Sequence, residues 1–237
     1  MLVAAAVCPC PPLLVPDVAA GAAPELDAAR TACTDALGVL AASRPDLLIV
    51  IGPADLAGRG PHPEGATGTF EEFGVDLGVR LGRDLGTVAD QPLPASLAVG
   101  AWLLARTGWA DAPVEALGVG EALESGRCTD TGRALAARAD RVALLVMGDG
   151  SACRTLKAPG YLDERATEFD AAASRALGAA DTGALIALDA ALGHELKAAG
   201  RAPWQVLAGA AQGAGLDGRL LYDDAPYGVG YLVAAWS

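Results

Sequence analysis

Three short segments hold the residues of this chain that are best suited to binding or catalysis. Each follows an apolar run of strand length, over residues 2–7, 46–51 and 141–147. In open α/β sheets, ligands bind at the carboxyl ends of the strands, so these segments are predicted to meet at one site. They are Cys8-Pro9-Cys10-Pro11-Pro12, Gly52-Pro53-Ala54-Asp55 and Gly148-Asp149-Gly150-Ser151-Ala152.

The first segment contains two thiols that could bind one metal ion. Cys8 and Cys10 are close in the chain, and His62 could reach them from a long loop predicted over residues 54–68. Iron(II) or zinc would suit such a set of donors. Alternatively, the cysteines pack as small apolar side chains, and His62, which lies between two prolines, is a solvated loop residue.

The third segment contains the best polar candidate, Asp149. It lies between two glycines, where backbone amides and a ligand could approach it closely, although it could equally stabilise a turn. Ser151 could cap the segment that follows. The chain has only 2 histidines, so no Ser-His-Asp triad is predicted.

Three further side chains could line the same crevice. Asp17 and Asp55 follow the first two strand-end turns, but either could instead cap a helix. Tyr227 could contact a planar ligand or pack in the core.

The elements that must position these residues alternate between strands and helices. This alternation predicts an α/β fold with a mostly parallel central sheet and helices on both faces, in one domain over residues 1–237. Further strands are predicted over residues 73–81, 114–119, 219–222 and 231–236. Helices are predicted over residues 26–40, 94–107, 127–139, 162–177, 182–199 and 201–211.

Composition excludes several classes of partner. The formal net charge of −12 and the lack of a Lys/Arg cluster argue against nucleic acid, because phosphate binding requires clustered cations. No apolar run reaches the roughly 20 residues of a membrane span. The 5 cysteines have no disulfide-framework spacing, which favours reduced thiols and a cytoplasmic location. A small molecule is the expected partner.

The turns and several downstream segments together resemble the LigB-type class III extradiol dioxygenase superfamily, in its small actinobacterial subunit-B-like branch. The resemblance rests on the Pro-Pro turn after the first strand, the proline turn after the second and the Gly-x-x-Ser turn after the third. It extends through Gly160-Tyr161-Leu162-Asp163-Glu164-Arg165-Ala166, Ala199-Gly200-Arg201-Ala202-Pro203-Trp204 and Ala225-Pro226-Tyr227-Gly228-Val229-Gly230-Tyr231, and so spans most of the chain.

This resemblance implies a three-layer sandwich and a ring-cleavage reaction at ferrous iron, held by two histidines and one carboxylate. The residues that match the two iron-binding histidines are Cys10 and Ala54, and Ala152 matches the acid/base histidine. Alanine can neither donate a lone pair nor transfer a proton.

We therefore expect a LigB-fold protein that has lost the iron chemistry, has no cofactor and binds a small molecule or a partner. Two alternatives remain. One is an active metal-dependent oxygenase or other metalloenzyme with a rearranged site, built from Cys8, Cys10, His62 or Asp149. The other is an interaction module that forms a homodimer through its closing strands.

Overall fold

Four parallel strands form the centre of the sheet in the computed structural model, which describes residues 1–86 and 91–237. Their spatial order is β6 (Val114–Val119), β2 (Leu47–Pro53), β7 (Val142–Met147) and β1 (Leu2–Cys8). All of β7 and most of β1 and β2 are buried, as expected of parallel strands covered on both faces. The predicted α/β class with a largely parallel core is therefore confirmed.

Antiparallel strands extend the sheet on both sides of this centre. β9 (Tyr231–Trp236) pairs with β1, and β8 (Gly218–Asp224) pairs with β9 at the edge. At the other edge, β3 (Gly60–His62) pairs with β6. The full order is β3-β6-β2-β7-β1-β9-β8, so this seven-stranded sheet is mixed rather than wholly parallel.

Helices cover both faces of the sheet because successive side chains of a strand point to opposite faces. In β1, Leu2, Ala5 and Val7 pack on one side. The helices of that side are α4 (Ser125–Ala136), α5 (Ala166–Gly178), α6 (Thr182–Ile186), α7 (Ala190–Glu195) and α8 (Arg201–Ala211).

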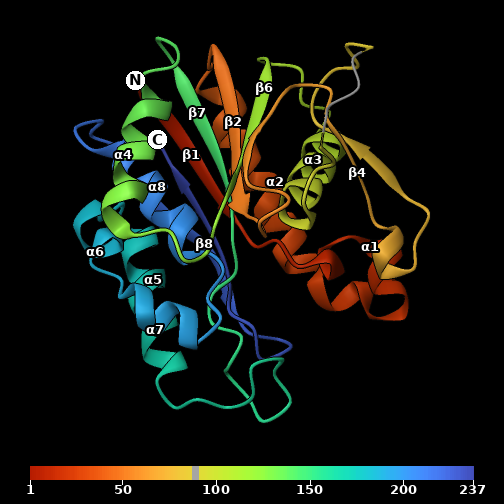
Figure 1. Ribbon diagram of the computed structural model, residues 1–237, viewed down its shortest axis with the longest axis vertical. Coiled ribbons are helices and arrows are strands. Elements are labelled where there is room, and N and C mark those ends of the chain that lie inside the picture. The colour runs from red at the N-terminus through yellow and green to blue at the C-terminus, as the bar shows by residue number, and fades with distance from the viewer. Residues whose placement is uncertain (87–90) are drawn as a thin grey trace.

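The other face of β1 presents Ala4, Ala6 and Cys8 to a second core. This core includes α2 (Asp27–Ala42) and α3 (Ala95–Thr107). The short α1 (Pro16–Ala19) and the 3-10 turns Pro12–Leu14 and Ala20–Leu26 connect β1 to α2. Figure 1 shows the sheet between these two groups of helices. None of the described helices is long and apolar enough to cross a membrane.

The structure differs from the sequence prediction in three segments. The predicted loop over residues 54–68 contains β3 and the start of β4 (Thr67–Thr69). The predicted strand over residues 73–81 is shorter: β5 (Gly78–Arg80) pairs only with β4, and the 3-10 turn Glu71–Phe73 precedes it. The alternating pattern predicted a strand correctly for only a few residues there, because β4 and β5 form a small sheet separate from the main one.

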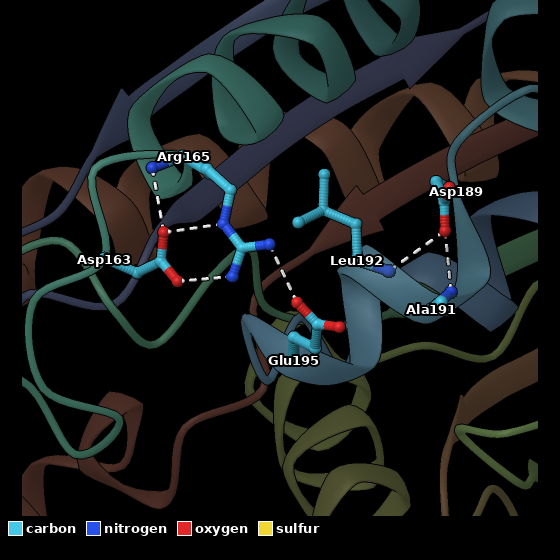
Figure 2. A network of polar contacts seen from close by, with 6 residues as sticks. All are labelled: Asp163, Arg165, Asp189, Ala191, Leu192 and Glu195. Atoms are coloured by element: carbon cyan, nitrogen blue, oxygen red, sulfur yellow. Dashed lines mark hydrogen bonds and ion pairs between the residues drawn. The ribbon is translucent and has the colours of Figure 1, made fainter.

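The predicted helix over residues 182–199 is two short helices, α6 and α7. Asp189 begins the second of them, since its carboxylate accepts hydrogen bonds from the backbone N–H groups of Ala191 and Leu192 at 2.8 and 2.9 Å (Figure 2). Aspartate is a strong N-cap residue, and this cap starts a new helix where the apolar spacing alone predicted continuity.

Candidate functional site at the strand ends

A cavity of about 480 Å³ lies at the carboxyl ends of the parallel strands. Its volume is in the range of small-molecule sites. Cys10 after β1, Asp55 after β2 and Glu121 after β6 contribute to its lining. The start of α3 closes another side through Pro94, Ala95 and Ser96. The other lining residues are Pro53, Ala54, Ala57, Gly58, Glu72, Pro92 and Leu93.

Cys10 and Asp149 come together because β1 and β7 are neighbours in register, with Cys8 opposite Met147. The backbone N–H of Cys10 donates a hydrogen bond of 2.8 Å to Oδ1 of Asp149. The Cys10 residue is only 7% exposed. Burial raises the pKa of its thiol well above the ordinary value, and the Asp149 and Glu121 carboxylates raise it further. Cys10 is therefore a protonated thiol at neutral pH rather than a thiolate nucleophile.

Asp149 is not among the residues that line the cavity, but its acidity is suited to proton transfer. Burial raises its pKa to about 7, against the opposing effect of the hydrogen bond from Cys10. Its second oxygen, Oδ2, makes no hydrogen bond to any residue in the described ranges. Burial also raises the pKa of Tyr231, and the nearby Asp149 adds to that effect. Asp149 can accordingly hold or release a proton close to neutral pH.

Ser151 is structural rather than free to react. Its backbone N–H and its hydroxyl both donate to the carboxylate of Asp170, each at 2.7 Å. Asp170 is 2% exposed and also accepts from Nη1 of Arg154 at 3.0 Å. This buried network attaches the turn that carries Asp149 to α5, and burial raises the pKa of Asp170.

The other two predicted aspartates have different positions. Asp55 lines the cavity, and its Oδ1 accepts a hydrogen bond of 3.0 Å from the backbone N–H of Gly58, so it also stabilises its own turn. Asp17 is exposed in the first turn of α1 and does not line the cavity.

Cys8 and His62, proposed with Cys10 as metal ligands, are not among the residues that line the cavity. Cys8 is fully buried in the core with α2, where the adjacent Cys33 thiol, and then burial, raises its pKa. His62 is 2% exposed, and its Nε2 donates to the carbonyl oxygen of Gly58 at 2.9 Å. The expectation of a solvated loop histidine was wrong because His62 belongs to β3.

Tyr227 lies outside this cavity and lines a separate hollow with Thr155, Leu156, Lys157 and Pro226. Its buried hydroxyl forms no hydrogen bond of ordinary geometry with the described part of the chain. Burial raises its pKa.

Sequence reasoning missed two acidic residues of the cavity, Glu72 and Glu121. Glu121 could have been found, because it follows the predicted strand over residues 114–119 just as the other candidates follow theirs. Its loop is held by Arg201, a 2% exposed guanidinium that donates to the backbone carbonyls of Glu121 and Leu123. No signal in the sequence assigns Glu72 to the cavity.

The side chains present do not fit the ferrous iron that the resemblance implies. Cys10 and Ala54 both line the cavity, but alanine supplies no donor atom. Within residues 1–86 and 91–237, no three His, Cys, Asp or Glu side chains are grouped so that they could hold a metal ion. Iron of that type requires two imidazoles and a carboxylate facing one point.

Comparison with solved structures supports the fold alone. The chain is similar to the crystal structure of an uncharacterized protein, JW3007 from Escherichia coli K12, with a TM-score of 0.61. The sequences are 17% identical, and the match covers 99% of each chain. No protein-family model and no curated protein matches the sequence.

Proposed function

We propose that this chain is a protein of the extradiol dioxygenase type, with that family's three-layer sandwich, that binds a small molecule where its relatives hold iron. One observation carries the proposal: Cys10 and Ala54, the two positions matched to iron-binding histidines, line the same cavity. They lie 44 residues apart in the chain, so their meeting in one cavity supports the correspondence. Because neither is a histidine, binding rather than ring cleavage is the function that this site supports.

The cavity provides what a small ligand requires. Pro53, Ala54 and Leu93 offer apolar contacts, and Cys10 and the three carboxylates offer polar ones. Such a combination of an apolar wall with a few polar groups is typical of ligand sites.

A first experiment tests the loss of iron chemistry. Protein expressed with added iron and then dialysed should retain far less than one iron per chain, measured by elemental analysis. It should also leave catechol unopened in air, measured by absorbance. One tightly held iron per chain together with ring opening would overturn the proposal.

A second experiment tests binding in the cavity. A fragment library screened by ligand-observed NMR should give binders whose signals weaken in the variant Ala57→Trp, because Ala57 is an exposed residue of the lining and an indole there fills the space. The matched control is Ala134→Trp, at an exposed position of α4 away from the lining. Binding that survives Ala57→Trp would place the ligand elsewhere.

A second candidate function is acid–base catalysis by Asp149, which its pKa of about 7 favours. A reaction of this kind would lose most of its rate in Asp149→Asn while ligand binding persisted. The rate of the wild type would rise with pH around 7 if the ionised carboxylate is the base, and fall if the neutral acid donates the proton.

A further inference from the structure

The backbone places Asp149 and Tyr231 side by side, although they are far apart in the sequence. The N–H of Gly150 donates to the carbonyl of Gly230 at 2.7 Å, and the N–H of Gly230 donates to the carbonyl of Ser151 at 2.9 Å. These bonds join the segment after β7 to the segment before β9. Asp149 and Tyr231 are the residues next to the bonded glycines.

The side chain of Asp149 points to the face of the sheet that α2 and α3 cover. A Cβ on Gly148 would collide with Gly200, at the start of α8. A Cβ on Gly150 would lie 2.8 Å from Oδ1 of Asp170, in α5. Both glycines therefore face the side of α5 and α8, and the residue between them faces the other side.

Tyr231 points to the same side as Asp149. A Cβ on Gly230 would lie 2.6 Å from Oδ2 of Asp170, and Leu232 packs in the core that includes α5 and α8. Tyr231 lies between these two residues and so faces α2 and α3. Burial raises the pKa of the Tyr231 phenol, and the charge of Asp149 is the next largest cause, as expected when the carboxylate lies close to the phenol.

Each of the two side chains retains a polar atom without a partner. Tyr231 is 2% exposed, yet its hydroxyl makes no hydrogen bond within residues 1–86 and 91–237. Oδ1 of Asp149 accepts from the Cys10 backbone, which leaves Oδ2 available. Both atoms still touch solvent. Because buried polar groups normally have partners, these two atoms indicate a place for a polar atom of a ligand.

We propose that Asp149 and Tyr231 form a second small-molecule site, in which the carboxyl group and the phenol both donate to the carbonyl oxygen of a neutral ligand. A phenol beside a neutral carboxylic acid can supply two donors to one oxygen. The formal net charge of −12 favours a neutral carbonyl compound over an anion. Neither residue lines the cavity of the proposed function, so the inference goes beyond it.

The ionisation of Asp149 controls this site near neutral pH. Its pKa is about 7, so the carboxyl group donates below that pH and only accepts above it. Three other titratable groups act on Tyr231 and stay protonated near neutral pH, because burial raises the pKa of each: Cys10, Tyr222 and Tyr227. Asp170 faces the opposite side, where Ser151 and Arg154 donate to it.

Two neutral probes with the same skeleton test the site. Acetophenone offers a carbonyl oxygen, which only accepts, whereas 1-phenylethanol offers a hydroxyl, which also donates. NMR titration of the full chain at pH 5.5 and pH 8.5 measures both dissociation constants. At pH 5.5 the ketone should bind more tightly than the alcohol, and it should shift the amide signal of Cys10, whose N–H contacts Asp149.

At pH 8.5 the preference should change in favour of the alcohol. Ionised Asp149 accepts a hydrogen bond from the alcohol and has no proton to donate to the ketone. The ratio of the two dissociation constants should therefore shift by about tenfold between the two pH values, as expected for one hydrogen bond to a charged group.

Three variants connect this preference to the named side chains. Tyr231→Phe keeps the ring and removes a hydroxyl that has no partner in the described chain, so it should fold and weaken acetophenone binding about fivefold at both pH values. Asp149→Asn stays neutral and can still donate, so it should bind the ketone equally at pH 5.5 and 8.5. Tyr161→Phe removes the same hydroxyl at a 63% exposed position and should change neither probe.

The comparison of ketone and alcohol separates a binding site from a structural role, because a structural defect would weaken both probes alike. The inference is overturned if the preference is the same at both pH values, or if both variants of the pair keep the wild-type preference and its pH dependence. Failure of both probes to bind at millimolar concentration also overturns it. The fragment screen with Ala57→Trp tests the cavity of the proposed function separately.

Discussion

Asp149 is a carboxyl group whose surroundings favour its neutral form. The ordinary pKa of 3.8 is raised to about 7, chiefly by burial. Below pH 4 the group is neutral in both folded and unfolded chains and costs nothing. Between pH 4 and 7 the unfolded chain ionises first, so this group lowers stability as pH rises, by at most about 4 kcal/mol above pH 7.

The variant Asp149→Asn should remove that pH dependence, because the amide stays neutral and its oxygen can still accept from Cys10. Relative to the wild type, its free energy of unfolding should increase between pH 5 and pH 8, measured by urea denaturation at both values. Asp76→Asn, at an exposed position, is the control and should show no such change. A difference that stays constant with pH would mean that Asp149 is not the group responsible.

Arg165 determines the acidity of a neighbouring carboxylate at the surface. It binds Asp163 through two nitrogens, at 3.0 and 2.7 Å, and reaches Glu195 of α7 at 2.8 Å (Figure 2). These bonds lower the pKa of Asp163 to about 2. Arg165→Gln should return that pKa toward roughly 4, the ordinary value for aspartate, in a carboxyl-carbon NMR titration. An unchanged pKa would contradict the contact.

At the scale of elements, α4 and α8 approach each other through glycines. A Cβ on Gly209 of α8 would collide with the backbone of Thr129, and one on Gly132 of α4 would collide with the carbonyl of Val206. Backbone atoms cannot move aside as a flexible side chain can, so these positions admit no larger residue. This contact positions α8. The first residue of α8 is Arg201, whose guanidinium donates to the Glu121 carbonyl and so holds the loop that carries Glu121.

Gly209→Ala should therefore destabilise the protein by about 2 kcal/mol or more. Gly126→Ala is the matched control: Gly126 also lies in a helix of this pair, but a Cβ there meets nothing within 4 Å. That change should be neutral or stabilise by up to about 1 kcal/mol, because alanine loses less backbone entropy in a helix. Urea denaturation of both variants measures the contrast, and equal effects would argue against a close crossing.

For the whole molecule, the last strand connects the parallel centre to the edge. β9 is buried along its length between β1 and β8, and Trp236 is fully buried, with its Nε1 donating to the Leu177 carbonyl at 2.7 Å. A chain that ends at Gly230 would leave β8 without a partner and would make β1, which still pairs with β7, an edge strand. We predict that it loses cooperative unfolding, measured by circular dichroism in a urea gradient, whereas removal of Ser237 alone should not have this effect.

Trp236→Phe is a milder test of the same strand. It keeps an aromatic ring but leaves the Leu177 carbonyl without this donor, and it should cost about 1–3 kcal/mol without altering cooperativity. A variant as stable as the wild type would show that the indole bond contributes little.

The homodimer alternative also concerns the whole molecule. β9 has neighbours on both sides, so of the two closing strands only β8 has a free edge. A copy could pair along β8, although Arg219, Asp223, Asp224 and the irregularity between Leu220 and Tyr222 are features that usually protect an edge from such pairing. Light scattering across a concentration series decides this alternative: a constant monomer mass excludes it.

The long elements could be predicted because each satisfies a local rule. The predicted strands over residues 2–7, 46–51 and 141–147 are apolar apart from Asp46 and Arg141 at their starts, and 201–211 is apolar apart from Arg201 and Gln205. Two features could not be predicted from the apolar pattern. The small sheet β4-β5 depends on which strands pair, and the break before α7 depends on the Asp189 cap. Among the candidate residues, the pattern identified Cys10 and Asp55, which line the cavity, and Asp149, which binds the Cys10 backbone, but it could not separate them from Asp17 or Cys8.

The amino-acid sequence by itself determined the α/β class, the strand ends where a site could form, and the absence of histidine at positions 10, 54 and 152. Only the tertiary structure decided which side chains share the cavity. The spatial order of the strands does not follow from their order in the sequence. β6 lies beside β2, which brings Glu121 to the cavity that Cys10 lines. β7 lies between β2 and β1, which places Asp149 within hydrogen-bond distance of the Cys10 backbone. Packing also decided how two other candidates are used: Ser151 bonds to Asp170, and His62 belongs to β3. Both side chains are buried, and buried polar groups need hydrogen-bond partners within the fold.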